Sequence, residues 1–168
     1  MHGMDVLEGR SPGVLTWGRL VDALDLSKED PAVVARYGDG KPYNYQDDGA
    51  PTCNDQLLLA RRLVEAGVRA VTLSFGRWDS HGQNFETHQE MVPELDRVMA
   101  ALLDDLKQRG LLENTLVVTM GEFGRTPDIN ASLGRDHFAA AWSAARFGCG
   151  IQPGPGFGQP AQFGKAVW

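Results

Sequence analysis

Cysteine is scarce in this sequence, with only Cys53 and Cys149 among 168 residues. The two lie far apart, and neither belongs to a C-x-x-C pair. This spacing favours two separate free thiols over a disulfide or a cysteine-based zinc site, so cysteine usage does not indicate the redox compartment. The first ten residues also lack the basic start and apolar core of a signal peptide, and the localisation is therefore unassigned.

Basic runs and long apolar runs are missing as well. The 16 Lys and Arg residues are outnumbered by 22 Asp and Glu residues, which gives a formal net charge of -6. Because no continuous basic stretch occurs, we expect no nucleic-acid partner. No segment approaches the ~20 consecutive apolar residues of a membrane-spanning helix, so we expect no membrane partner either.

The composition that is present is typical of a globular protein with one core. Hydrophobic residues make up 42% of the chain and charged residues 23%. The pattern predicts a weakly ordered segment with short helices over residues 1–51, an α/β core over 52–147 and an irregular Gly- and Pro-rich tail over 148–168. Within the first segment, Ser27 followed by acids and Pro31 is typical of a helix start.

Apolar periodicity in the core predicts alternating helices and strands. They are a helix capped by Thr52 or Asn54 and running to about Ala66, a strand Val68–Phe75, a long helix Phe85–Arg109, a strand Leu116–Met120 buried on both faces, and a short helix Phe138–Phe147. Strand, long helix and strand form a βαβ unit with parallel strands, so the predicted fold class is α/β. Both strands then end at one edge of the sheet, which predicts that loops 76–84 and 121–125 are neighbours.

These loops and the segment after them carry donors that suit a metal. The candidates are Asp79, His81, Glu122, Asp136 and His137. Carboxylates and imidazoles together are a normal shell for zinc, manganese or iron. Each residue also has a structural alternative: Asp79 could cap a turn, His81 could be an exposed imidazole, and Asp136 could pair with Arg135 or cap a helix. The sequence leaves these alternatives open.

Two arginines next to the candidate ligands add a second theme. Arg125 and Arg135 could bind phosphate or sulfate oxygens in a bidentate way, or form salt bridges with nearby acids. His88 is within possible reach at the start of the long helix. Ser80 and Thr126 are nearby hydroxyls, but no base is arranged beside either, so the catalytic residues are unknown.

The order of several motifs is similar to that of one known family. The segments L-L-A-R-R-L-V-E-A-G-V-R-A-V, W-D-S-H-G, T-L-V-V-T-M-G-E-F-G-R-T-P and G-R-D-H-F follow one another within residues 27–147. In them the chain resembles the family called domain of unknown function 1501, which is considered sulfatase-like and similar to the alkaline phosphatase superfamily. The resemblance implies a partial alkaline-phosphatase-like sheet, as the C-terminal portion of that fold, with flanking helices.

The same resemblance implies a chemistry. Enzymes of that superfamily hydrolyse phosphate or sulfate esters at a bimetallic site. This implies one or two divalent ions, zinc, manganese or calcium, and a small anionic ester as substrate. It assigns ligand roles to Asp79, His81, Asp136 and His137. Glu122 can replace the Asp of the sulfatase S-D-H-G motif, whereas Phe123 cannot replace its His.

Two departures from the family pattern qualify this expectation. The nucleophile and the first metal-binding Asp of that superfamily lie upstream of the region that this sequence resembles. The tail after Arg146 is expected to differ from the family. The sequence therefore predicts a metal-dependent hydrolase of phosphate or sulfate esters, or an incomplete C-terminal part of one without the nucleophile. The alternative is a non-catalytic ligand-binding module of the same fold, and the oligomeric state is unassigned.

Overall fold

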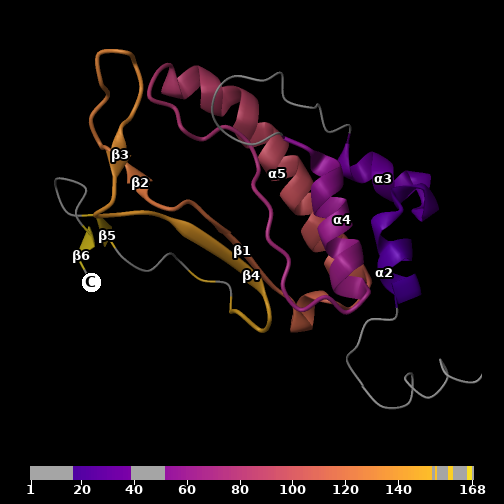
Figure 1. The fold of residues 1–168 in the computed structure, drawn as a ribbon. Coiled ribbons are helices and arrows are strands. Elements are labelled where there is room, and N and C mark those ends of the chain that lie inside the picture. The colour runs from indigo at the N-terminus through magenta and orange to yellow at the C-terminus, as the bar shows by residue number, and fades with distance from the viewer. Residues whose placement is uncertain (1–16, 39–51, 153, 155–158, 161–165, 168) are drawn as a thin grey trace, which may run out of the picture.

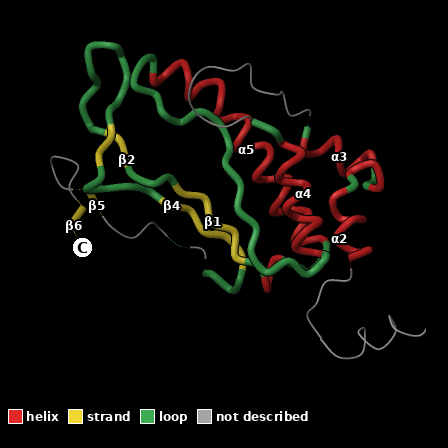
Figure 2. Tube along the Cα trace, viewed as in Figure 1, coloured by secondary structure: helices red, strands yellow, loops and turns green. Residues whose placement is uncertain are grey.

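The computed structural model describes residues 17–38, 52–152, 154, 159–160 and 166–167. The helices are α2 (Trp17–Leu24), α3 (Pro31–Tyr37), α4 (Asn54–Glu65) and α5 (Asn84–Gln108), with 3-10 turns η1 (Leu26–Lys28) and η2 (Leu112–Asn114). The strands are β1 (Leu116–Met120), β2 (Gly124–Arg125), β3 (His137–Phe138), β4 (Ala144–Gly148), β5 (Gln159–Pro160) and β6 (Ala166–Val167). Helices gather on one side and strands on the other (Figures 1 and 2).

The helices begin where their local sequence allows. Asp30 caps α3 by accepting a hydrogen bond from the Ala32 amide at 2.8 Å, and Pro31 occupies the first turn, where no donor is needed. The predicted cap, Ser27, instead lies inside η1. The two helices predicted over 52–66 and 85–109 are confirmed as α4 and α5, and α5 continues through Pro93.

The apolar core lies between α3, α4 and α5. Its buried members are Tyr37, Leu57, Leu58, Val98, Ala101, Leu102 and Leu106. Val98, Leu102 and Leu106 belong to the stripe that helical spacing predicts along α5. Val117 of β1 packs against this cluster from the strand side, which attaches the first strand to the helices.

A charged network is buried beside this apolar core. The Arg61 side chain is 1% exposed and that of Asp105 is 2% exposed, and their Nε and Oδ2 atoms are 2.8 Å apart. Arg61 also pairs with Glu29, and the Tyr37 hydroxyl donates to Asp105 at 3.1 Å. Burial raises the pKa of Glu29, but hydrogen bonds from Arg62 and Arg61 outweigh it and lower the pKa to about 2.

The strands pair in antiparallel fashion. β1 pairs with β4, with Val118 opposite Arg146, and β2 pairs with β3, with Arg125 opposite His137. The α/β class is confirmed in this coarse form, as helices with small antiparallel sheets. Only one face of β1 is covered: Leu116, Val118 and Met120 are 51%, 45% and 62% exposed. The prediction that this strand is buried on both faces is therefore wrong.

Two predicted elements do not form. Residues 70–75 form no strand and make no ladder with any described strand, so the predicted strand Val68–Phe75 and its parallel pairing are absent from the part of the chain that the structure describes. A strand needs a partner as well as a favourable pattern. The predicted helix 138–147 is also wrong, because pairing of β3 with β2 and of β4 with β1 outweighs the helix propensity of its alanines.

No helix among the described residues is long and apolar enough to cross a membrane.

Candidate metal centre

Two loops distant in sequence are joined at the start of α5. The amides of Gln83 and Asn84 donate to the carbonyls of Ser132 and Leu133 at 3.0 and 2.9 Å, and the Arg135 amide donates to the Ser80 carbonyl at 3.0 Å. Figure 1 shows the loop beyond β2 and β3 next to the start of α5. These bonds bring residues 78–84 beside residues 130–137, without any contribution from a parallel sheet.

Gly134 allows the closest approach between the two loops. A Cβ atom built at this position would lie 2.0 Å from the carbonyl carbon and oxygen of His81. Only glycine lets the backbone pass at this distance. The loop after β2 therefore presses directly on the backbone of a candidate ligand.

Three donor side chains converge where the loops meet. The Oδ1 atom of Asp79 lies 3.1 Å from His81 Nε2 and 2.9 Å from His137 Nε2. The two Nε2 atoms are 3.0 Å apart. Ligand atoms of these residues all lie within 4.8 Å of one another. One carboxylate oxygen and two imidazole nitrogens thus form a nearly equilateral triangle.

This triangle matches the donor spacing of a metal shell. Ligands about 2.0–2.1 Å from a zinc-type ion are separated by about 2.9 Å along an octahedral edge and about 3.4 Å along a tetrahedral edge. The observed separations of 2.9, 3.0 and 3.1 Å fall within this range. The side chains of Asp79, His81 and His137 are 36%, 46% and 49% exposed, which leaves room for water or a substrate on the outer side.

Asp136 determines which nitrogen of His81 is available. Its Oδ1 atom lies 2.8 Å from His81 Nδ1. Hydrogen bonds from His81 and Asn130 lower the pKa of Asp136. Because an ionised carboxylate can only accept, this contact favours the His81 tautomer that has its proton on Nδ1 and a lone pair on Nε2 facing the triangle.

Arg125 and Phe123 support the other side of the triangle. Arg125 binds Asp79 through Nη2 and donates from Nη1 to the Arg135 carbonyl at 3.2 Å. The Phe123 ring packs against the His137 ring, with centroids 4.1 Å apart. Partial burial raises the pKa of Asp79, but hydrogen bonds from His137 and Arg125 outweigh it and lower the pKa to about 2. The Asp79 carboxylate is thus charged at neutral pH.

Comparison with known families identifies the chain. Residues 16–168 match the family model described as "Protein of unknown function (DUF1501)". The chain belongs to the DUF1501 family. The match continues through residues 148–168, so the predicted departure of the tail from the family is wrong. No curated protein and no solved structure matches the sequence.

The other predicted ligands of this DUF1501 chain lie outside the triangle. Glu122, the residue before Phe123, is exposed and does not belong to the converging group. Asp136 contacts the opposite nitrogen of His81 rather than the triangle. His88 also lies outside the group: its Nδ1 atom is 2.7 Å from the Asn84 carbonyl, and its ring meets Trp78 edge-on.

The two arginines predicted to bind an anion are both engaged within the protein. Arg135 donates from Nη1 to the carbonyls of Thr126 and Pro127, each at 2.6 Å. Arg125 is held by Asp79 and by the backbone of residue 135. In this structure the two guanidinium groups stabilise the loops, and their anion-binding role stays a prediction.

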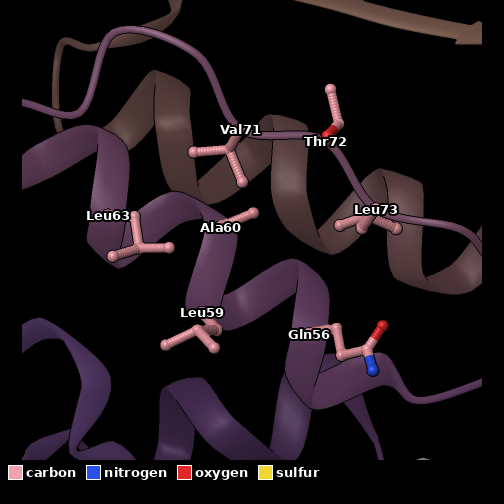
Figure 3. A pocket seen from close by; sticks show the side chains of 7 residues that line it. All are labelled: Gln56, Leu59, Ala60, Leu63, Val71, Thr72 and Leu73. Carbon is pink, nitrogen blue, oxygen red and sulfur yellow. The ribbon is translucent and has the colours of Figure 1, made fainter.

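A mainly apolar hollow of about 300 Å³ lies elsewhere, between α4 and the loop that follows it. It is lined by Gln56, Leu59, Ala60, Leu63, Val71, Thr72 and Leu73. Figure 3 shows Leu59 and Leu63 on the helix and Val71 and Leu73 on the loop. The lining contains no titratable group, so the hollow supplies no catalytic acid, base or metal ligand.

Sequence reasoning missed Asn130, which contacts both loops. Its side-chain amide donates to the His81 carbonyl at 3.0 Å and to Asp136 Oδ1 at 3.1 Å. The available signal was weak: an Asn four residues before a Gly, in a loop rich in turn-forming residues.

Proposed function

We propose that this chain is a metal-dependent hydrolase of phosphate or sulfate esters, or part of one, and that Asp79, His81 and His137 hold its metal. The observation that carries the proposal is the triangle of donor atoms, with edges of 2.9, 3.0 and 3.1 Å. The ester class comes from the sulfatase-like resemblance of the motifs around these residues.

The donor types favour zinc, with manganese next. Two imidazoles and one carboxylate form a common catalytic zinc shell with an open position, whereas calcium prefers six to eight oxygen ligands. An ion held there would polarise an ester oxygen and lower the pKa of a bound water. The second ion that the resemblance implies would need donors beyond the three that converge.

The protein groups around the triangle orient its donors. Asp136 holds the proton of His81 on Nδ1, and Arg125 holds Asp79 in its ionised form. The two nearby hydroxyls are engaged elsewhere, since Ser80 Oγ donates to Asn84 Oδ1 at 2.7 Å and Thr126 Oγ1 donates to the Asp128 carbonyl at 3.0 Å. The proposal therefore assigns no side-chain nucleophile.

A second candidate function is a non-catalytic metal-binding module. The internal contacts of Arg125 and Arg135 favour it, because both guanidinium groups are occupied by protein oxygens instead of facing an open site. A module of this kind would bind zinc without turning over an ester.

Isothermal titration calorimetry with zinc and with manganese tests metal binding. We expect one high-affinity zinc site per chain, with the affinity lowered at least ~10-fold in Asp79→Asn and His137→Ala. Asp128→Asn is the matched control, since it removes an exposed carboxylate of the same loop region. A wild-type chain that binds neither metal contradicts the proposal.

Turnover of aryl phosphates and aryl sulfates separates the two candidates. Zinc-dependent hydrolysis that disappears in Asp79→Asn supports the hydrolase. Zinc binding without turnover supports the non-catalytic module, and agrees with the sequence-based expectation that the nucleophile is absent.

We also propose the finer fold assignment, an alkaline-phosphatase-like sheet with residues 68–75 as a parallel strand. Its support is the strand-like sequence pattern of residues 68–75, together with the position of β1, which pairs along only one of its edges among the described strands. Amide hydrogen exchange over residues 70–75 tests it: strong protection indicates a strand partner, and rapid exchange indicates that the segment is unpaired.

A further inference from the structure

The side chain of Asn130 joins the two loops of the candidate metal centre. Its Oδ1 atom accepts from the amides of Ser132 and Gly134, both at 2.9 Å. Its Nδ2 group donates to the His81 carbonyl at 3.0 Å and to Asp136 Oδ1 at 3.1 Å. The side-chain oxygen therefore binds the backbone of its own loop, whereas the side-chain nitrogen binds His81 and Asp136 at the candidate metal centre.

The orientation of this amide is fixed by its partners. A flipped side chain would place the NH2 group against two N–H donors and the oxygen against two oxygens, which loses every bond. The donor side must therefore face His81 and Asp136. Both contacts lead to the same imidazole, because Asp136 Oδ1 also lies 2.8 Å from His81 Nδ1.

We propose that Asn130 is a positioning residue that fixes Asp136, and through it holds His81 with a proton on Nδ1 and a lone pair on Nε2. The carboxylate shared by Asn130 and His81 is the link between them. The bond from Asn130 to the His81 carbonyl fixes the backbone that carries the ring. This inference rests on the proposed metal site only for its metal readout, since the protonation pattern of His81 is a property of the chain itself.

The first test measures the tautomer of His81 directly. In nitrogen-15-labelled full-length chain without metal, long-range nitrogen–proton spectra distinguish Nδ1–H from Nε2–H rings, and His81→Gln assigns the signal. We expect the Nδ1–H form in the wild type. An Nε2–H ring in the wild type overturns the proposal.

Two variants separate positioning from loop closure. Asn130→Asp keeps an oxygen for the Ser132 and Gly134 amides but removes the donor, whereas Asn130→Ala removes both. We expect His81 to lose its preference for Nδ1–H in both variants. Ala131→Asp adds the same charge at an exposed neighbouring position and should leave the tautomer unchanged.

The remaining outcomes are equally clear. If Asn130→Asp behaves as the wild type and only Asn130→Ala changes, the residue merely closes its loop and the proposal is overturned. The same holds if neither variant alters the tautomer, or if Ala131→Asp alters it as much as Asn130→Asp does.

Zinc titration distinguishes this inference from the proposed function. We expect Asn130→Ala to lower zinc affinity about 10-fold, the lower end of effects for residues that orient a ligand. A tautomer that depends on Asn130 in a wild-type chain that binds no zinc refutes the proposed function and leaves the positioning role standing. Unchanged zinc affinity in a variant with an altered tautomer overturns the link to the metal site.

Discussion

Two polar clusters among the described residues are built differently. In the network of Glu29, Arg61 and Asp105, each buried carboxylate meets at least one guanidinium, and the side chains are almost inaccessible. In the triangle of Asp79, His81 and His137, one carboxylate oxygen and two imidazole nitrogens face one another and remain partly exposed. The first cluster is buried and its carboxylates are matched by its own guanidinium groups, so it stabilises the fold. The second holds one guanidinium, that of Arg125 on Asp79 Oδ1, but its two imidazoles are partly exposed and could still accept a metal ion, so it is the better candidate for a function.

The largest effect should follow from breaking the buried network. Asp105→Asn leaves the Arg61 guanidinium buried without its full charge partner, and removing one partner of a buried pair costs about 3–5 kcal/mol. Urea unfolding should show this loss of stability. Asp104→Asn, an exposed change on the same helix, is the control and should stay within about 0.5 kcal/mol of the wild type. Equal effects of the two substitutions would contradict the structural role of the network.

Adding zinc should stabilise the folded chain through the triangle of Asp79, His81 and His137. A ligand that binds only the folded chain stabilises it by about 2.7 kcal/mol at a concentration 100 times its dissociation constant. Zinc should therefore raise the thermal midpoint, and a chelator should reverse the shift. In Asp79→Asn the shift should largely disappear, whereas in Asp105→Asn it should persist on a lower baseline. Loss of the zinc shift in both variants would show that the clusters are not independent.

The buried network should make the stability of the chain depend on pH through Glu29. The pKa of Glu29 is lowered from 4.5 to about 2, so the unfolded chain binds the proton more readily than the folded chain. Its contribution is complete above about pH 5 and is lost as the pH falls toward 2. The loss should amount to about 2–3 kcal/mol. Urea unfolding between pH 6 and pH 3 measures it, and Glu29→Gln should flatten the profile relative to Glu113→Gln.

The smallest effect should come from Glu122. Its exposed position outside the triangle leads us to expect that Glu122→Gln changes zinc affinity less than 2-fold and stability less than about 0.5 kcal/mol. The sequence-based assignment of Glu122 as a ligand predicts a loss of at least ~10-fold. A zinc titration of Glu122→Gln decides whether Glu122 is a metal ligand or an exposed loop residue.

Local periodicity was enough to predict the long elements. α4, α5 and β1 were predicted because their apolar spacing is strong and continuous. Residues 68–75 and 138–147 were mispredicted because their state depends on partners that a local pattern does not show. The network around Arg61 was not foreseen for a similar reason, since charges on helices are usually exposed.

The candidate site was predicted in part, and by an argument that does not hold for the described residues. Asp79, His81 and His137 do converge, but through antiparallel pairing of β2 with β3 and bonds between loops. Glu122 was included because it follows β1, and the position after a strand does not determine where its side chain lies. Asn130 was missed because its role depends on contacts with residues up to 49 positions away.

The sequence distance within the triangle has a consequence for the order of folding. His81 and His137 are 56 residues apart, and α5 and β1 lie between them. Closing such a long loop costs entropy, which structure already in place must offset. We therefore expect the two imidazoles to come together only in a nearly native chain. Zinc added during refolding should then leave the folding rate almost unchanged. It should instead slow unfolding, because it binds contacts that form only in the native state.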